Sequence, residues 1–184
     1  NQIGNKSFPF TSIQAAIENA NTRRSGVANV AMDVYVAAAA SPYAEEISLR
    51  PGISIRGGYL ATDWSRNIAA NVTTIQAPID MAIKAGPTIT GAYTSTTWVE
   101  GFTVQGAANS ISYGIFLSNS SPTLSNNIIT GGTVTANGSS YGIYCNSSAP
   151  TISNNTMTGG LATGGGATSY GLYNNSSSPV ISGN

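Results

Sequence analysis

The chain has 184 residues, of which 41% are hydrophobic and 8% are charged, and seven basic side chains balance seven acidic ones. This size suits one domain with its own core, and the lack of net charge disfavours nucleic acid or anionic lipid as a partner. With no histidine and one cysteine, histidine-based metal or nucleophilic sites and an internal disulfide are excluded. We therefore expect no cofactor and no metal. We also expect no membrane insertion, because no apolar run reaches about 18 residues.

The first predicted element is an α-helix near residues 11–21. Thr11 and Gln14 have the spacing of a capping box, and the aliphatic residues that follow recur at helical spacing. A β-solenoid has an open apolar core and an unpaired strand edge at its end, which a helix can cover. We therefore predict that residues 1–33 form an N-terminal cap.

Irregular coils are predicted next, over residues 34–97. The sequence there contains short runs with alternating or β-branched residues, bounded by Gly, Pro and Asn. These strand-like runs cover residues 33–37, 46–49, 53–56 and 72–77.

Regular coils follow over residues 98–184. Residues 113–132, 141–160 and 170–184 are three similar segments, whose tyrosines at 113, 141 and 170 are spaced by 28 and 29 residues. A weaker copy begins at Val99. No helix fits between the short strands of each unit, and three strands per unit of this length predict one coil of a parallel β-helix.

Two kinds of residue are predicted to stack from coil to coil inside the solenoid. Strand parity points a set of aliphatic side chains inward. These are Ile115, Ile143 and Leu172 in the first strand and Leu124, Ile152 and Ile181 in the second. Asn127, Asn155 and Asn184 lie in register at the next bend, where asparagine tolerates left-handed backbone and can bond its counterpart in the next coil. Phe102 replaces this asparagine in the earliest clear coil.

The order of motifs resembles the right-handed β-helix proteins of the pectin-lyase-like superfamily, in particular their uncharacterised, exported bacterial branch. The motifs are FTSIQAAIENA, VYVAAA, GISIRGGY, WVEGFTVQG and the YGI coils, and they span most of the chain. The resemblance implies a single right-handed parallel β-helix domain over residues 1–184 and an extracellular or cell-surface location. It is not specific for activity, because this architecture carries lyases, hydrolases and adhesins.

Charged residues all lie at or before Glu100, so the regular coils offer no acid-base pair and we assign no catalytic residue there. Upstream, Glu45 with Glu46, or Asp63 with Arg66, could form a site, but we interpret both pairs as structural. Glu45 and Glu46 are adjacent and would point to opposite faces of a strand, and residues 63–66 have the composition of a polar loop. A carbohydrate-active enzyme, with its site in the cap-proximal coils or beyond residue 184, is the alternative function.

A column of aromatic side chains is the main candidate for binding. Phe116, Tyr144 and Tyr173 share one outward position, where flat rings could stack on a sugar. The polar residues Ser118, Asn146 and Asn175 follow at the next outward position and could hydrogen-bond it. Tyr113, Tyr141 and Tyr170 form a second register that we interpret as packing at a corner.

These features predict a non-catalytic surface solenoid with an adhesive or glycan-binding role and a neutral polysaccharide as partner. An ice-binding or purely filamentous role is a further alternative. Because the sequence stops at Asn184, before the third strand of its coil, we expect a fragment of a longer protein that can associate end to end through the open C-terminal coil.

Overall fold

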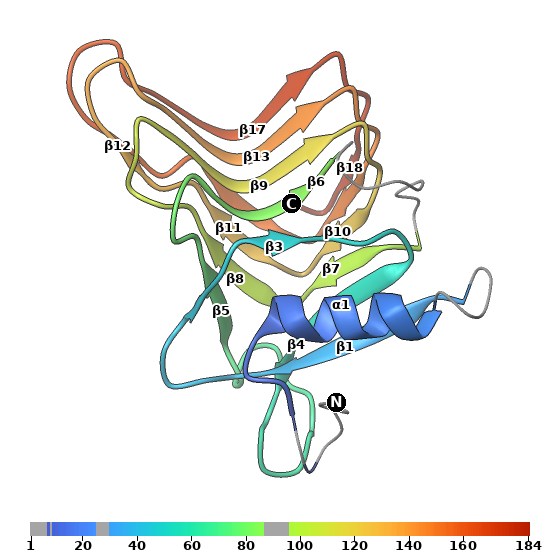
Figure 1. Cartoon of the computed structure of the whole chain (residues 1–184). Coiled ribbons are helices and arrows are strands. Elements are labelled where there is room, and N and C mark those ends of the chain that lie inside the picture. Colours follow the sequence, from blue (N-terminus) through green and yellow to red (C-terminus); the bar gives the residue numbers. More distant parts are fainter. Residues whose placement is uncertain (1–6, 8, 25–29, 87–95) are drawn as a thin grey trace.

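The computed structural model describes residues 7, 9–24, 30–86 and 96–184. It is a parallel β-solenoid of about five coils with one helix near the N-terminus, which confirms the parallel β-helix predicted from the repeats. In Figure 1 the strands β6, β9, β13 and β17 lie one above another as successive coils. Every pair of named strands is parallel.

The elements are short and follow one another closely along the chain. They are α1 (Ile13–Arg24), β1 (Met32–Ala37), β2 (Tyr43–Ala44), β3 (Ile47–Ser48), β4 (Ile53–Tyr59), β5 (Thr73–Gln76), β6 (Met81–Ala85), β7 (Trp98–Glu100), β8 (Phe102–Gln105), β9 (Ile111–Ser118), β10 (Thr123–Ser125), β11 (Ile128–Thr130), β12 (Thr133–Val134), β13 (Ser139–Asn146), β14 (Thr151–Ser153), β15 (Thr156–Thr158), β16 (Leu161–Ala162), β17 (Thr168–Asn175) and β18 (Val180–Ser182).

Three sheets run along the solenoid. One has the order β1-β4-β7-β10-β14-β18, the second β2-β5-β8-β11-β15 and the third β3-β6-β9-β13-β17. A fourth, two-stranded sheet joins β12 to β16 in the links between regular coils, and these links protrude beside the stacked coils in Figure 1.

The predicted inward columns are confirmed. Ile115, Ile143 and Leu172 are in register across β9, β13 and β17, and the Leu124 column is in register across β10, β14 and β18. The first two members of each column are fully buried, whereas Ile181 in the last coil is 50% exposed. Stacked aliphatic side chains therefore fill the core, as strand parity predicted.

The asparagine ladder is also confirmed, with one correction. Asn155 Oδ1 accepts hydrogen bonds from the backbone amide and the Nδ2 of Asn127 at 3.0 and 2.9 Å, and Asn184 Oδ1 repeats both bonds to Asn155 at 2.7 and 3.1 Å. The left-handed backbone, however, belongs to the preceding residues Asn126 and Asn154, with φ of 55° and 56°. In each bend the first asparagine thus adopts the left-handed turn conformation, and the second makes the ladder hydrogen bonds.

Phe102 ends this ladder. Its side chain is buried, and its amide donates to Asn127 Oδ1 at 3.0 Å, so the first ladder asparagine keeps its contact with the coil before it. An aromatic side chain therefore replaces the amide column where the irregular coils begin.

The helix lies against the first coil, and the prediction of its N-terminus was wrong by one position. Ser12, not Thr11, is the N-cap, because Ser12 Oγ accepts from the Ala15 amide at 3.2 Å. Gln14 does not complete a capping box: its side chain bonds both backbone groups of Ser48 in β3 at 2.8 and 3.3 Å. Ile17 of α1 is fully buried in the core.

Candidate functional site

The predicted aromatic column lies on the outer face of the third sheet. Phe116, Tyr144 and Tyr173 occupy equivalent positions of β9, β13 and β17. Ring centroids are 5.5 Å apart between Phe116 and Tyr144 and 5.3 Å apart between Tyr144 and Tyr173, with interplanar angles of 13° and 15°. The three rings therefore form a continuous stack along the solenoid.

The second tyrosine register packs from coil to coil, as its interpretation as a packing register requires, and it belongs to the same surface as the first. Tyr113, Tyr141 and Tyr170 stack at 5.2 and 5.5 Å, nearly parallel. Within each coil the two registers meet edge to face, for example Tyr141 and Tyr144 at 5.0 Å and 80°. We call these six residues the aromatic array.

A glycine in each strand brings the two registers together. Strict alternation would point Tyr113 to the same side as Ile115, but Gly114 and Ile115 are both buried in succession, so Tyr113 and Phe116 both lie outside. A Cβ on Gly114 would come within 2.8 Å of Ile129 Cγ2, and one on Gly142 within 2.6 Å of the Thr158 carbonyl oxygen. Only glycine fits this break in alternation.

The rings of the array present edges rather than faces. Parallel rings at these separations overlap in offset stacks, so each interior ring is covered by its neighbours in the coils before and after. The hydroxyl groups of the five tyrosines bond no described group in the chain, and they are not buried, so they contact solvent. Tyr170 and Tyr173 are the most exposed members, at 39% and 37%. The array therefore presents ring edges and phenol groups rather than a flat platform of ring faces.

The predicted polar residues form a column beside the array. Ser118, Asn146 and Asn175 are in register at the ends of their strands. Asn175 Nδ2 donates to Asn146 Oδ1 at 2.9 Å, and Asn146 Nδ2 donates to Ser118 Oγ at 3.4 Å. Ser118 is buried, so a ligand would reach Asn146 and Asn175 more easily than Ser118.

Charges border the array only on the side of the earlier coils. Lys84 stands next to Phe116 in the register of β6 and β9, and it pairs with Glu46. Desolvation raises the pKa of Tyr113, and the neighbouring Tyr141, Tyr144 and Asp80 raise it further. Tyr113 therefore stays neutral at physiological pH.

A second cluster lies on the outer face of the first sheet, around Glu100. Glu100 Oε2 lies 2.5 Å from Arg56 Nη1 and 3.2 Å from Arg66 Nη2, and Arg56 Nε also pairs with Asp33 at 3.1 Å. Arg56 stacks over Trp98 at 5.4 Å, beside a hollow of about 270 Å³. Sequence reasoning gave Glu100 no role, because its partners are distant along the chain.

This cluster brings two carboxylates together, as the enzyme alternative requires, but its charges are already paired. Partial burial opposes ionisation of Glu100, yet the hydrogen bond from Arg56 and the charge of Arg66 outweigh it and lower its pKa. A general acid in glycoside hydrolysis needs a raised pKa instead. The arrangement suits a structural ion network better than proton transfer.

The remaining candidate groups have structural partners. Glu45 bonds the start of α1, whereas Glu46 pairs with Lys84, which fits the prediction that they point apart. Asp63 accepts a hydrogen bond from the Ser65 amide at 2.8 Å, while Arg66 pairs with Glu100. Cys145 is fully buried, which raises the pKa of its thiol to about 12.

No protein-family model, curated protein or solved structure matches this chain. Within the described residues, no group of three or more acidic or cysteine side chains could hold a metal ion. The one described helix is too short and too polar to cross a membrane.

Proposed function

We propose that this protein is a non-catalytic, exported, right-handed β-helix of the bacterial cell surface that binds neutral glycans along the aromatic array. One observation carries the proposal: five tyrosine hydroxyls project from two stacked registers, and within each register the rings of neighbouring coils are 5.2 to 5.5 Å apart. A polysaccharide lying along the solenoid could meet this row with its own repeated hydroxyl groups.

The chemistry of the surface favours a neutral ligand. Residues 101–184 contain no Asp, Glu, Lys or Arg, so an anionic glycan finds no counter-ion there. The ring edges supply apolar contact, and Asn146 and Asn175 supply further hydrogen-bonding groups next to the array. Because the surface is open to solvent and carries no charged side chain after Glu100, binding is modest in affinity and insensitive to salt.

The test is a screen of neutral polysaccharides for binding, followed by hydroxyl deletion on any ligand found. The double variant Tyr144→Phe with Tyr173→Phe keeps the stack but removes two hydroxyls, so it should weaken binding about tenfold, as expected for roughly two lost hydrogen bonds. Tyr35→Phe is the matched control, because Tyr35 is an exposed tyrosine of another sheet. Unchanged affinity in the double variant means that the array is only a structural stack.

The enzyme alternative is distinguished in the same screen. Asp33 and Glu100 share Arg56, so a polysaccharide cleaved by the wild-type protein and left intact by Glu100→Gln would establish catalysis in the first coils. We expect no cleavage, since Glu100 remains ionised.

End-to-end association stays a prediction. Val180 and Ile181 of β18, in the last described coil, are 63% and 50% exposed. If this face pairs with a second copy, sedimentation equilibrium should show concentration-dependent dimers that Ile181→Lys removes. A monomer at all concentrations would contradict it.

A further inference from the structure

The outer face of the third sheet repeats itself once per regular coil. The strands β9, β13 and β17 have eight residues each, more than any other described strand, and equivalent residues lie opposite one another along them. In both registers of the aromatic array the ring centroids of neighbouring coils are 5.2 to 5.5 Å apart. A molecule that lies along the solenoid therefore meets the same groups again at this interval.

Polar columns border the array on both sides. On one side, Ser139 Oγ and Thr168 Oγ1 lie 3.0 Å apart in neighbouring coils, and on the other Asn175 Nδ2 donates to Asn146 Oδ1 at 2.9 Å. None of these four residues is buried, and the side chains keep further donors and acceptors beyond these bonds. The face is thus aromatic along its centre and polar along both edges.

An extended β-1,4-linked glycan has the same division and nearly the same period. Its sugar rings form a ribbon with hydroxyl groups along both edges, and each sugar advances the chain by almost the distance that separates neighbouring rings of the array. One sugar can therefore lie on each coil. Helical α-1,4-linked chains and curved β-1,3-linked chains do not keep this register, because their successive sugars turn away from a straight line.

The length of the array sets how many sugars it can contact. Lys84 stands at the position of Phe116 in the coil before, where it pairs with Glu46, so the aromatic column begins at Phe116. From there the described rings cover the coils of β9, β13 and β17. Three consecutive sugars can thus contact equivalent groups.

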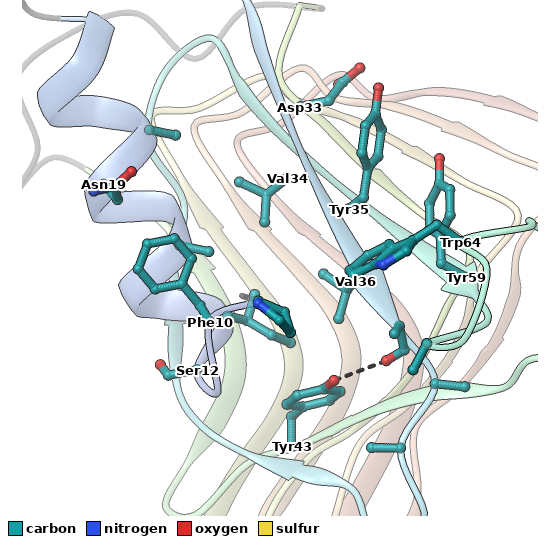
Figure 2. Close-up of a pocket in the computed structure, with 18 of the residues that line it drawn as sticks. Phe10, Ser12, Asn19, Asp33, Val34, Tyr35, Val36, Tyr43, Tyr59 and Trp64 are labelled. Atoms are coloured by element: carbon teal, nitrogen blue, oxygen red, sulfur yellow. Dashed lines mark hydrogen bonds between the residues drawn. The ribbon is translucent and has the colours of Figure 1, made fainter. Parts of the chain in front are cut away.

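The hollow between α1 and β1, of about 880 Å³, does not offer such a repeat. It is lined mainly by residues of α1 and β1, which lie at the N-terminal end of the solenoid. Figure 2 shows Val34 and Val36 of β1 pointing toward α1, and both side chains are buried. A ligand that repeats once per coil therefore fits the array and not this hollow.

We propose that the array takes an extended, neutral β-1,4-linked glycan that runs along the solenoid with one sugar on each of three coils, an inference that rests on the glycan binding proposed above. The stacked rings are already fixed in this period, so binding costs little ordering of the protein. A straight glycan likewise loses less conformational freedom than a flexible one.

The first experiment compares glucose tetrasaccharides that differ only in linkage: cellotetraose (β-1,4), laminaritetraose (β-1,3) and maltotetraose (α-1,4). Each is titrated into the protein, and the tyrosine ring resonances report binding. Cellotetraose should bind about tenfold more tightly than the other two, because it alone contacts three coils at once and makes the additional hydrogen bonds. β-1,4-Mannotetraose should also bind, since it has the same extended shape.

The second experiment tests the direction of the bound chain. Tyr113→Phe, Tyr141→Phe and Tyr170→Phe each remove one hydroxyl from a different coil and keep the ring. Each should weaken cellotetraose binding about threefold, as expected for one lost hydrogen bond, whereas Tyr35→Phe in β1 should not.

Equal affinity for the three linkages overturns the proposal, and so does a loss confined to the variant of a single coil, although glycan binding by the array would stand in both cases. The proposal also falls if neither cellotetraose nor β-1,4-mannotetraose binds at millimolar concentration. The proposed function itself falls only if no neutral polysaccharide binds, so the two failures are distinguishable.

Discussion

The carboxylate of Glu45 caps the N-terminus of α1, 32 residues away from Ile13 in sequence: Oε1 accepts from the Ile13 amide at 2.9 Å and Oε2 from the Gln14 amide at 3.0 Å. A negative charge at a helix N-terminus is stabilising, and here it also fixes the helix to the first coil. We expect Glu45→Ala to lower the free energy of unfolding by about 1–2 kcal/mol.

Urea unfolding measures this loss, and Glu46→Ala is the matched control. Glu46 pairs with Lys84 at the surface, where an ion pair contributes about 0–1 kcal/mol. Equal losses in the two variants would show that α1 does not depend on Glu45. Deleting residues 1–21 should destabilise more than either substitution, because the first coil then loses most of the helix that covers it.

The ladder and the turn can be separated with neighbouring substitutions. Asn155 makes five hydrogen bonds in the interior, so Asn155→Ala leaves buried groups without partners and should cost roughly 1–3 kcal/mol. Asn154→Gly should be close to neutral, because glycine adopts the left-handed conformation of Asn154 readily. Thermal unfolding compares the two, and similar midpoints would contradict the division of roles.

Gly142→Ala should destabilise the protein by more than about 1 kcal/mol, as overpacking does. The new Cβ would lie 2.5 Å from the Gly171 carbonyl oxygen and 2.6 Å from that of Thr158, both backbone atoms that cannot rotate away. Gly165→Ala is the control, since nothing lies within 4 Å of a Cβ there. Urea unfolding of both variants is the measurement, and a neutral Gly142→Ala would mean that the array does not need the break in alternation.

Stability should fall in acid partly through Glu100. The pKa of Glu100 is lowered in the folded protein, so the unfolded chain binds a proton there first as the pH falls. The stabilisation that ionised Glu100 contributes above about pH 4.3 is therefore lost as the pH falls further. Glu100→Gln should therefore be less stable than the wild-type protein at pH 7, and the difference should shrink toward pH 3. A difference that stays constant over this range would argue against the ion network.

Cys145 should resist thiol reagents at pH 8 in the folded protein. Cys145 is fully buried, so a reagent cannot reach its sulfur. Desolvation also raises the pKa of its thiol to about 12, so the reactive thiolate form is scarce at pH 8. Iodoacetamide labelling followed by mass spectrometry should show modification only after unfolding in urea. Rapid labelling under native conditions would indicate that the β13 region opens readily.

The sequence was most informative where the chain repeats. Strand parity and spacing located the Leu124 column and the ladder at Asn155, because the same environment recurs in each coil. The first coils do not repeat, so the contact between Glu45 and α1 could not be read from local spacing. β2 has only two residues, too few for a periodic signal. The contact between the two tyrosine registers depends on Gly114, where the inward-outward alternation of side chains is broken. Strand parity assumes strict alternation, so it could not place Tyr113 beside Phe116.

All 14 formally charged side chains fall in the first 100 residues. The early coils therefore carry charges of both signs, whereas residues 101–184 carry none. Electrostatic repulsion cannot keep two such neutral surfaces apart, and a protein with a net charge near zero has little colloidal protection. The regular coils must remain dissolved through the hydration of their Asn, Ser and Thr side chains. Their solubility should thus vary little with ionic strength but strongly with solutes that compete for water.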